Sequence, residues 1–273
     1  MGSERLLMTV DTIAEGVDFT LPTASPRQIG RKALAINLSD IAAMGGRPSF
    51  CVASVALTRG IEETFARELY KGLRRAADRY GCPLVGGDVT TWDGGVVVTV
   101  AAGGVLAGKK AVRRNGARPG DLVLVTGTLG GSILGGHLRF TPRLAEGAWL
   151  AEMFPPTAMI DISDGLGVDS GHLAEESGCA ISIEARGVPV STAARRLAGE
   201  SGKSALEHAV GDGEDFELLL TLPAAMAARC IEAWSFRTRL SVIGKVSKGA
   251  GVRLVHNDGS EERIDTKGYQ HIG

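Results

Sequence analysis

Residues 26–46 read PRQIGRKALAINLSDIAAMGG, and this stretch predicts one long helix. Pro26 suits the first helical position, and the glycine pair that starts at Gly45 is a typical helix end. Asp40 stands among Ala, Leu, Ile and Met residues, and Asn37 shares its helix face because the two are three residues apart. Such polar groups either hydrogen-bond to a neighbouring helix or bind a ligand, and the helix alone leaves both interpretations open.

Further carboxylates lie beside short apolar segments that predict strands. We expect a polar turn at Asp11 after a strand at residues 6–10, and a strand end just before Asp88. We also expect Asp164 to cap a helix that follows a strand at residues 158–160. The complete set is Asp11, Asp40, Asp88, Asp161, Asp164, Glu214 and Asp215. A single acid of this kind is usually a turn or cap residue, but carboxylates are costly to bury, so the set indicates a shared role. Oxygen ligands without His or Cys suit Mg²⁺, which in turn suits phosphates.

A glycine-rich turn at residues 126–131 lies between a predicted strand and a helix expected at residues 132–138. Exposed backbone N–H groups in such a turn can bind an anion, although glycine-rich turns of this type are common. Residues 103–110, GGVLAGKK, come close to a phosphate-binding loop but lack its final hydroxyl residue. A basic, turn-rich run follows instead of a helix, which argues against that interpretation.

The order of elements predicts a mixed α/β (α+β) protein with two domains. A first domain covers residues 1–108, a basic and turn-rich linker covers 109–120, and a second domain covers 121–273. Both lengths are normal for compact domains.

Composition excludes several classes of function. The 273 residues carry a formal net charge of −1 and no basic block, so nucleic-acid binding is not expected. No apolar run is long enough to cross a membrane. The four cysteines, which we interpret as buried core residues in a reducing compartment, are widely spaced, and we expect a cytoplasmic protein.

Seven phrases, in order along nearly the whole chain, resemble the AIR-synthase-like superfamily of ATP-dependent enzymes and, within it, the thiamine-monophosphate kinases. They are TVDTIAEGV (9–17), KALAINLSDIAAMG (32–45), GGD (86–88), RNGARPGD (114–121), TGTLG (126–130), IDISDGL (160–166) and GEDFELL (213–219). Near the C-terminus stand Gly268, Tyr269, Gln270 and His271, which are similar to the family's closing residues. The helix phrase and IDISDGL are the most specific of these.

The resemblance implies an N-terminal mixed sheet that pairs with a second subunit, and a C-terminal α/β domain with ATP near the junction. It implies Mg²⁺-assisted transfer of the γ-phosphate of ATP to thiamine monophosphate, giving thiamine diphosphate, in a homodimer. The implied metal ligands are Thr9, Asp11, Asp40, Asp88, Asp161 and Asp164. The implied ATP contacts are Gly87, Asp88, Arg114 and Ser163, and the implied acceptor contacts are Asp18, Glu214 and Tyr269. No covalent catalytic residue is expected, because phosphoryl transfer depends on alignment and charge neutralisation.

Three departures from the family pattern keep other interpretations open. The family has a Gly-Asp-Asp-Ala segment ahead of the Thr9 phrase, and we expect this segment, with its metal ligand, to be missing here. Asp18 stands where the family has a His that meets the substrate phosphate, and Val89 to Trp92 replace a Thr-Thr-Arg run. The alternatives are an enzyme of the same superfamily with a different acceptor, or a truncated, inactive nucleotide-binding relative.

Overall fold

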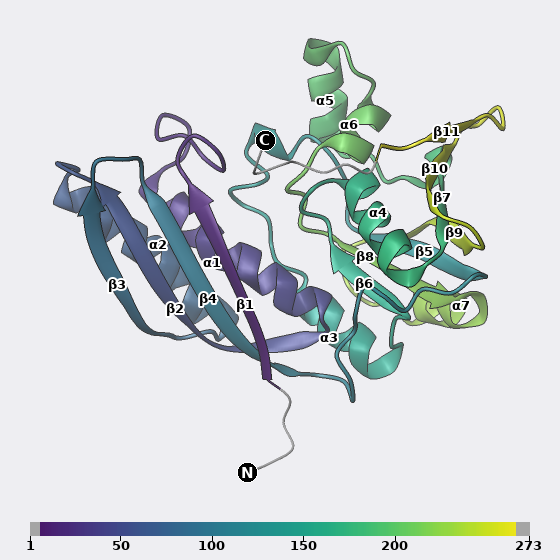
Figure 1. Cartoon of the computed structure of the whole chain (residues 1–273), viewed down its shortest axis with the longest axis horizontal. Helices are drawn as coiled ribbons and strands as arrows, with labels where there is room; N and C mark the ends of the chain where they lie inside the picture. The colour runs from purple at the N-terminus through teal and green to yellow at the C-terminus, as the bar shows by residue number, and fades with distance from the viewer. Residues whose placement is uncertain (1–5, 266–273) are drawn as a thin grey trace.

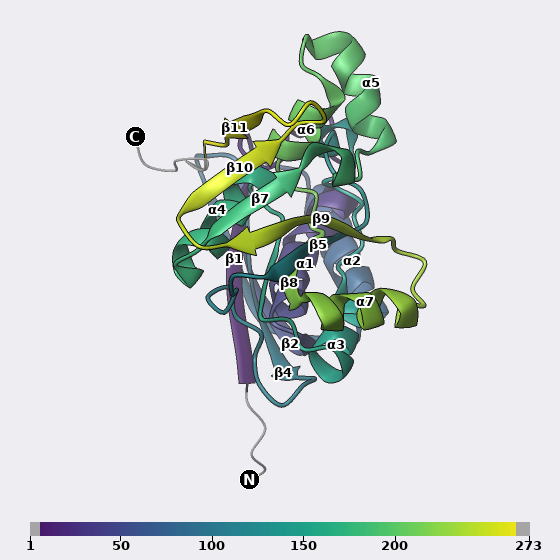
Figure 2. The ribbon, with the colours of Figure 1, turned by 90° about the vertical axis from the view of Figure 1, so that its right-hand side faces the viewer.

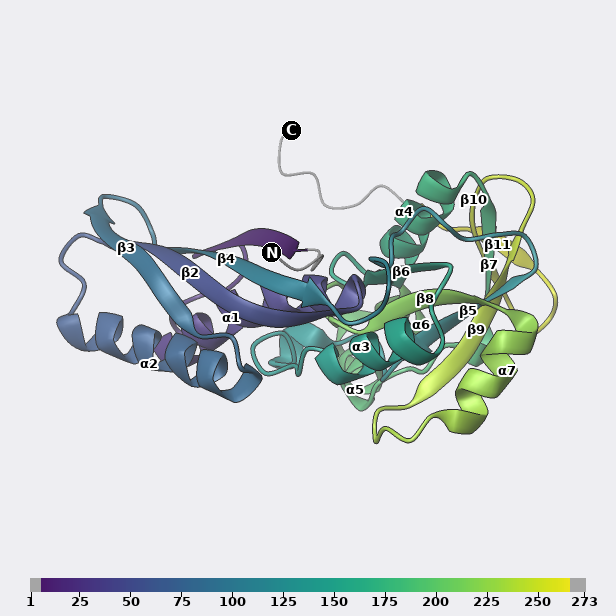
Figure 3. The ribbon, with the colours of Figure 1, turned by 90° about the horizontal axis from the view of Figure 1, so that it is seen from below.

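The computed structural model describes residues 6–265, and it contains two sheets side by side with helices packed against them (Figure 1). The first sheet has the strand order β1-β4-β2-β3, in which only β2 and β3 are parallel. Helices α1 and α2 lie along one of its faces (Figure 3). The elements of this half are β1 (Leu6–Ala14), α1 (Pro26–Ala43), β2 (Gly46–Thr58), α2 (Glu63–Tyr80), β3 (Leu84–Trp92) and β4 (Val97–Leu106).

The second sheet has the strand order β11-β10-β7-β9-β5-β8-β6. Figure 2 shows β10, β7 and β9 on the outer side of this half, with α5 and α6 at one end. Its strands are β5 (Asp121–Thr126), β6 (Ala158–Asp161), β7 (Ala180–Glu184), β8 (Leu218–Pro223), β9 (Leu240–Ser247), β10 (Gly251–Val255) and β11 (Glu261–Arg263). Its helices are α3 (Leu144–Met153), α4 (Leu166–Ser177), α5 (Thr192–Ser201), α6 (Ala205–Gly211) and α7 (Ala224–Ala233), with short 3₁₀ turns η1 (Ser132–Leu134) and η2 (Ala185–Gly187).

Helix α1 forms where the sequence predicts it. Ser25 and Gln28 make a reciprocal capping box at its start, and Pro26 takes the first turn. Gly30 lets α2 approach closely, because a Cβ at this position would lie 2.1 Å from the carbonyl oxygen of Leu69. The chain leaves the helix through Gly45, whose φ of +68° suits glycine.

The C-terminal end of α1 belongs to the core of both halves. Ala42 and Ala43 pack in one apolar cluster with Leu124, Leu150 and Leu220 from the second half. A Cβ on Gly147 of α3 would lie 2.3 Å from the carbonyl oxygen of Ala42, so the two helices cross closely here. Burial of this apolar surface holds the end of α1 against the second sheet, and Asp40 is carried with it.

Several local expectations were wrong, and for Asp11 and Asp88 the reason is strand pairing. Asp11 does not start a turn, since β1 pairs with β4 through to Ala14. Asp88 lies inside β3, where it pairs with Ser54 of β2. Gly165, not Asp164, is the N-cap of α4, and it makes no side-chain cap bond. The helix expected at 132–138 is only the turn η1, which is flanked by left-handed glycines.

All four cysteines are buried with free thiols, as expected of core residues. Within residues 6–265, no helix combines the length and the apolar character needed to cross a membrane.

Candidate functional site

Three aspartates from separate elements meet where the two halves join, and we call Asp11, Asp40 and Asp161 the acid cluster. Asp11 comes from β1, Asp40 from the last turns of α1, and Asp161 from the end of β6. The carboxyl groups of Asp11 and Asp40 lie close enough for Asp40 to raise the pKa of Asp11. Thr9 donates its hydroxyl to Asp40 Oδ2, and Ser39 donates to Asp161 Oδ2 at 2.5 Å. The structure thus brings together four of the predicted ligands, Thr9 included.

The acid cluster is poorly solvated and self-repelling. Burial, followed by the nearby Asp40, raises the pKa of Asp11 to about 7. Burial and the same Asp40 raise the pKa of Asp161 to about 7, although the hydrogen bond from Ser39 opposes this. Carboxylates in such an arrangement need a proton or a cation between them. An all-oxygen donor set of this kind fits Mg²⁺.

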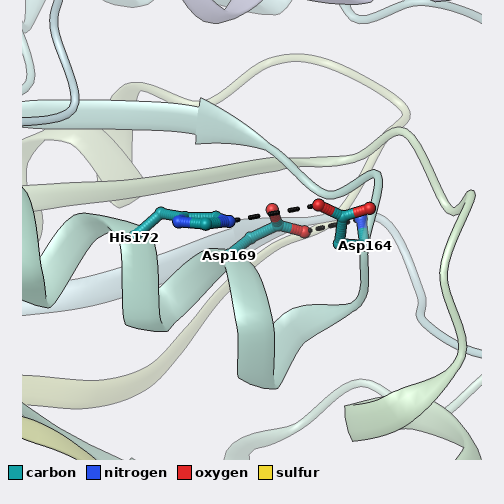
Figure 4. Close-up of side chains that lie close together, drawn as sticks. All are labelled: Asp164, Asp169 and His172. Atoms are coloured by element: carbon teal, nitrogen blue, oxygen red, sulfur yellow. Dashed lines mark hydrogen bonds and ion pairs between the residues drawn. The ribbon is translucent and has the colours of Figure 1, made fainter. Parts of the chain in front are cut away.

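A second acidic group lies on the turn that follows β6. Figure 4 shows Asp164, Asp169 and His172 turned toward one another, the last two from α4. The backbone N–H of Asp164 donates to Asp169 Oδ2 at 3.0 Å, and His172 Nε2 lies 4.0 Å from Asp164 Oδ2. The candidate ligand atoms of all three residues lie within 4.8 Å of one another. Burial, followed by Asp161 and Asp164, raises the pKa of Asp169 to about 8.

Sequence reasoning missed Asp169 and His172. Both lie on α4, three residues apart and therefore on one helix face. The first of them follows Asp164 by five residues. That spacing was the available signal.

A pocket of about 430 Å³ opens beside the acid cluster, and we call it the arginine pocket. Asp40 and Asp161 line it together with Arg113 and Arg114. The guanidinium of Arg114 is half-exposed and lies 3.3 Å from Glu176, so it can turn toward an anion in the pocket. Carboxylates and guanidinium groups that line the same pocket suit a phosphate chain that carries a divalent cation.

Gly87 and Asp88 do not join this site within one chain. They lie on β3, which forms the edge of the first sheet opposite β1. Asp88 is exposed, and it pairs with Ser54 on the sheet face that α1 and α2 leave open.

A second pocket, of about 530 Å³, lies between the turn after β1 and the segment around η1, and we call it the loop pocket. Asp18, Arg139 and Glu214 line it, together with apolar side chains of Val17, Ile133 and Leu134. The carboxylate of Asp18 accepts the backbone N–H of Ala14 at 2.8 Å, so one of its oxygens serves its own turn. Glu214 also lines a neighbouring pocket of about 380 Å³, and both pockets therefore meet at this residue.

Lys32 lies behind Glu214 and was also missed from the sequence. It is fully buried on α1, and its Nζ donates to Glu214 Oε1 and, at 2.8 Å, to the carbonyl oxygen of Asp18. The signal was a charged residue on the apolar stripe of the helix, three residues after Ile29.

The N–H groups of the glycine-rich turn after β5 are hydrogen-bonded to carboxylates of the same chain. The N–H of Gly130 donates to both carboxylate oxygens of Asp215, at 3.0 and 2.9 Å. The N–H of Gly131 donates to Asp212 at 2.8 Å. These donors bind side chains of the same protein, so the phosphate contact considered for this turn is not available to them. Tyr269, the remaining predicted acceptor contact, lies outside the described residues.

Comparisons with known proteins bear on the family and the fold of this chain. Residues 1–106 match the family described as AIR synthase related protein, N-terminal domain. The thiamine-monophosphate kinase of Rhodopirellula baltica is 38% identical over 267 residues, which cover 98% of this chain and 84% of the relative. The chain belongs to the thiamine-monophosphate kinase family.

Another member of this family, from Aquifex aeolicus, is 33% identical over 99% of the chain and 89% of the relative. Among solved structures, AaThiL complexed with AMPPCP and TMP has a TM-score of 0.86 and 32% identity. It matches 99% of this chain, which covers 88% of that structure. The predicted family and its two-sheet, AIR-synthase-like fold are confirmed.

Proposed function

We propose that this protein transfers the γ-phosphate of ATP to the phosphate of thiamine monophosphate and so forms thiamine diphosphate. The observation that carries the proposal is the acid cluster beside the arginine pocket, in a chain of the thiamine-monophosphate kinase family. A related structure holds AMPPCP, an analogue of ATP, together with TMP. Neither an exposed nucleophile nor a strong base is needed, because the acceptor phosphate is already ionised.

We propose that Asp11, Asp40, Asp161 and Asp164, with Thr9, hold Mg²⁺ ions. When bound, Mg²⁺ neutralises charge on the phosphates and aligns them. The crowded carboxylates with raised pKa values fit such a group, since each is poorly stabilised without a cation. In this proposal Arg114, which lines the arginine pocket, binds the phosphates of ATP, and Ser163 adds a contact from the turn next to Asp164.

The acceptor contacts belong to the other side of the same junction. We propose that Asp18 and Glu214 line the acceptor site in the loop pocket, and that Tyr269 covers it. Apolar Val17, Ile133 and Leu134 suit the rings of thiamine, and the Glu214 carboxylate suits their positive charge and amino group. In this proposal the two substrates occupy separate pockets, ATP the arginine pocket and thiamine monophosphate the loop pocket.

We also propose that the protein works as a homodimer. On β1, the apolar side chains Leu6, Met8 and Val10 alternate onto the open face of the first sheet and are exposed. Asp88 lies on this same open face. If β3 of a second copy closes against β1, Asp88 of the partner subunit completes the acid cluster.

The domain limits that we propose for each copy are residues 1–108 and 121–273, joined by a linker at 109–120. We also propose a cytoplasmic location, which the four buried free thiols support.

The assay for the reaction incubates the protein with ATP, Mg²⁺ and thiamine monophosphate, and separates the products by chromatography. Thiamine diphosphate should form in proportion to protein and should disappear with EDTA. Binding of ATP without any product would contradict the proposed acceptor and would indicate a different small anion in the loop pocket.

The dimer has its own test, which mixes two inactive variants, Asp88→Asn and Asp161→Asn. If each site takes Asp161 from one chain and Asp88 from the other, a mixed dimer contains one intact site, and mixing restores about a quarter of the wild-type activity. If both residues act within one chain, every site in the mixture carries a defect. Activity would then stay at the level of the separate variants, which would refute the shared site.

A further inference from the structure

The burial of Lys32 calls for an explanation other than packing. Its side chain has no exposed surface, although an ammonium group is costly to remove from water unless it is paired and hydrogen-bonded. The structure supplies both compensations, through the carboxylate of Glu214 and the carbonyl oxygen of Asp18. An apolar side chain of similar size would fill the same space, so packing alone does not explain a lysine here.

The two partners of Lys32 lie on separate loops, and both loops line the loop pocket. Asp18 belongs to a closed turn, in which its own N–H donates to the carbonyl of Ala14 at 3.0 Å and Gly16 N–H donates to the carbonyl of Phe19 at 2.8 Å. Glu214 belongs to the loop before β8, in the other half of the molecule. Lys32 is therefore one group, on a rigid helix, that ties both walls of the pocket.

Glu214 is itself held in an unusual conformation. Its φ is +62°, in the left-handed region that non-glycine residues seldom occupy. Its backbone N–H donates to the carbonyl of Ser163 at 2.7 Å, so the main chain at Glu214 is fixed to the turn beside Asp164. Its carboxylate is about one-third exposed and lines both neighbouring pockets. With Oε1 bound to Lys32, the remaining oxygen has a defined direction toward the pockets.

We propose that Lys32 is a positioning residue for the acceptor: it orients the Glu214 carboxylate and holds the Asp18 turn at a set distance from it. This inference rests on the proposed function, since it assigns Lys32 a part in binding thiamine monophosphate. Lys32 lies behind the carboxylate and does not touch the acceptor. Its effect therefore reaches the acceptor only through Glu214 and the Asp18 turn, and the ATP side of the site does not depend on it.

The test compares Lys32→Met with the wild type in steady-state kinetics. We expect the KM for thiamine monophosphate to rise by about tenfold, while the KM for ATP changes by less than about twofold. The matched control is Arg27→Met, which removes another α1 cation that pairs with an acid, Glu68, away from both pockets. This control should leave both KM values unchanged. A similar rise in both KM values for Lys32→Met would indicate general disruption and would overturn the proposal, as would no change.

A double substitution tests whether Lys32 acts through Glu214. In a Glu214→Gln background, adding Lys32→Met should raise the acceptor KM by less than about twofold, because the group that Lys32 orients has already lost its charge. Independent, multiplying effects would exclude the route through Glu214.

Amide hydrogen exchange in the ligand-free protein tests the same idea without any substrate. Lys32→Met should speed exchange in residues 14–19 and 212–217, and leave the remainder of α1 and α2 at the wild-type rate. If the wild type makes no thiamine diphosphate but this change in exchange is seen, the proposed reaction fails and the tie between the loops stands. If the wild type is active and exchange in both segments is unaltered, the role of Lys32 is refuted.

Discussion

The substitution Asp161→Asn removes one negative charge from the acid cluster while it keeps the size of the side chain and one acceptor oxygen for Ser39. Asp161 is 6% exposed, and its pKa is raised from 3.8 to about 7 by burial and by Asp40. At a pH above both values, this displacement corresponds to about 4 kcal/mol of lost stability. Because Asp11 and Asp40 share the repulsion, we expect the substitution to recover between about 1 and 3 kcal/mol.

The sign of the effect depends on pH. Below its ordinary pKa, the Asp161 carboxyl is neutral in the folded and unfolded states and makes no difference to stability. Between that value and about 7, the unfolded chain ionises the group freely, while the folded protein ionises it at a cost. The metal-free wild type should therefore lose stability across this window, and Asp161→Asn should lose less. If Mg²⁺ binds the folded acid cluster as proposed, it should stabilise the wild type more than the variant.

Thermal unfolding followed by circular dichroism measures this directly, in EDTA at about pH 5 and about pH 8. The variant should melt about 3 to 10 °C higher than the wild type at the higher pH and by a smaller margin at the lower one, where only part of the cost is present, and it should have no kinase activity. Asp121→Asn is the matched control. Asp121 is also a buried acid, but it accepts hydrogen bonds from Arg118 N–H and Thr157 Oγ1, so its loss should destabilise. A wild type equally stable at both pH values, or a variant less stable than the wild type, would refute the reasoning.

Two further substitutions test contacts that support the site. Arg143→Met leaves the buried Glu217 carboxylate without its ion-pair partner, so it should cost about 3 to 5 kcal/mol in urea unfolding, and adding Glu217→Gln should recover part of the loss. An unchanged unfolding midpoint for Arg143→Met would contradict this. Gly30→Ala forces a methyl group against the Leu69 carbonyl and should cost about 1 to 3 kcal/mol by separating α1 from α2. Full stability of Gly30→Ala would show that the two helices do not cross as closely as described.

The sequence was sufficient for α1, because that helix depends on local features: Ser25, Pro26 and Gly45 set its ends. It was insufficient wherever sheet pairing decides the element. Asp11 and Thr12 have a turn-like sequence, yet β4 offers partners along all of β1. The N–H groups of the glycine-rich turn looked free for an anion, but Asp212 and Asp215 bind them from more than eighty residues away.

In the candidate site, too, some residues could be predicted from the sequence and others depend on tertiary contacts. Resemblance to a family identified Asp11, Asp40 and Asp161 as one group, and the end of α1 does bring them together. Lys32 and Asp169 were overlooked because their importance comes from partners distant in the chain or from burial. The local signals, a charge on an apolar helix face for Lys32 and the spacing from Asp164 for Asp169, do not reveal either cause. The resemblance implies that Asp88 is a metal ligand, but Asp88 lies on the edge strand opposite β1. Within one chain it is therefore not part of the acid cluster.

Helix α1 links these observations, since it carries Lys32 toward the loop pocket and Ser39 and Asp40 toward the acid cluster. Lys32 and Asp40 are eight residues apart, which is about 12 Å along a helix axis. Both ends of α1 are fixed, by α2 at Gly30 and by the second core at Ala42, so this separation cannot change without loss of packing. Phosphoryl transfer depends on a set distance between donor and acceptor. We therefore expect α1 to set that distance, with the loops of the proposed acceptor site held at Lys32 and the proposed metal-binding carboxylates at its other end.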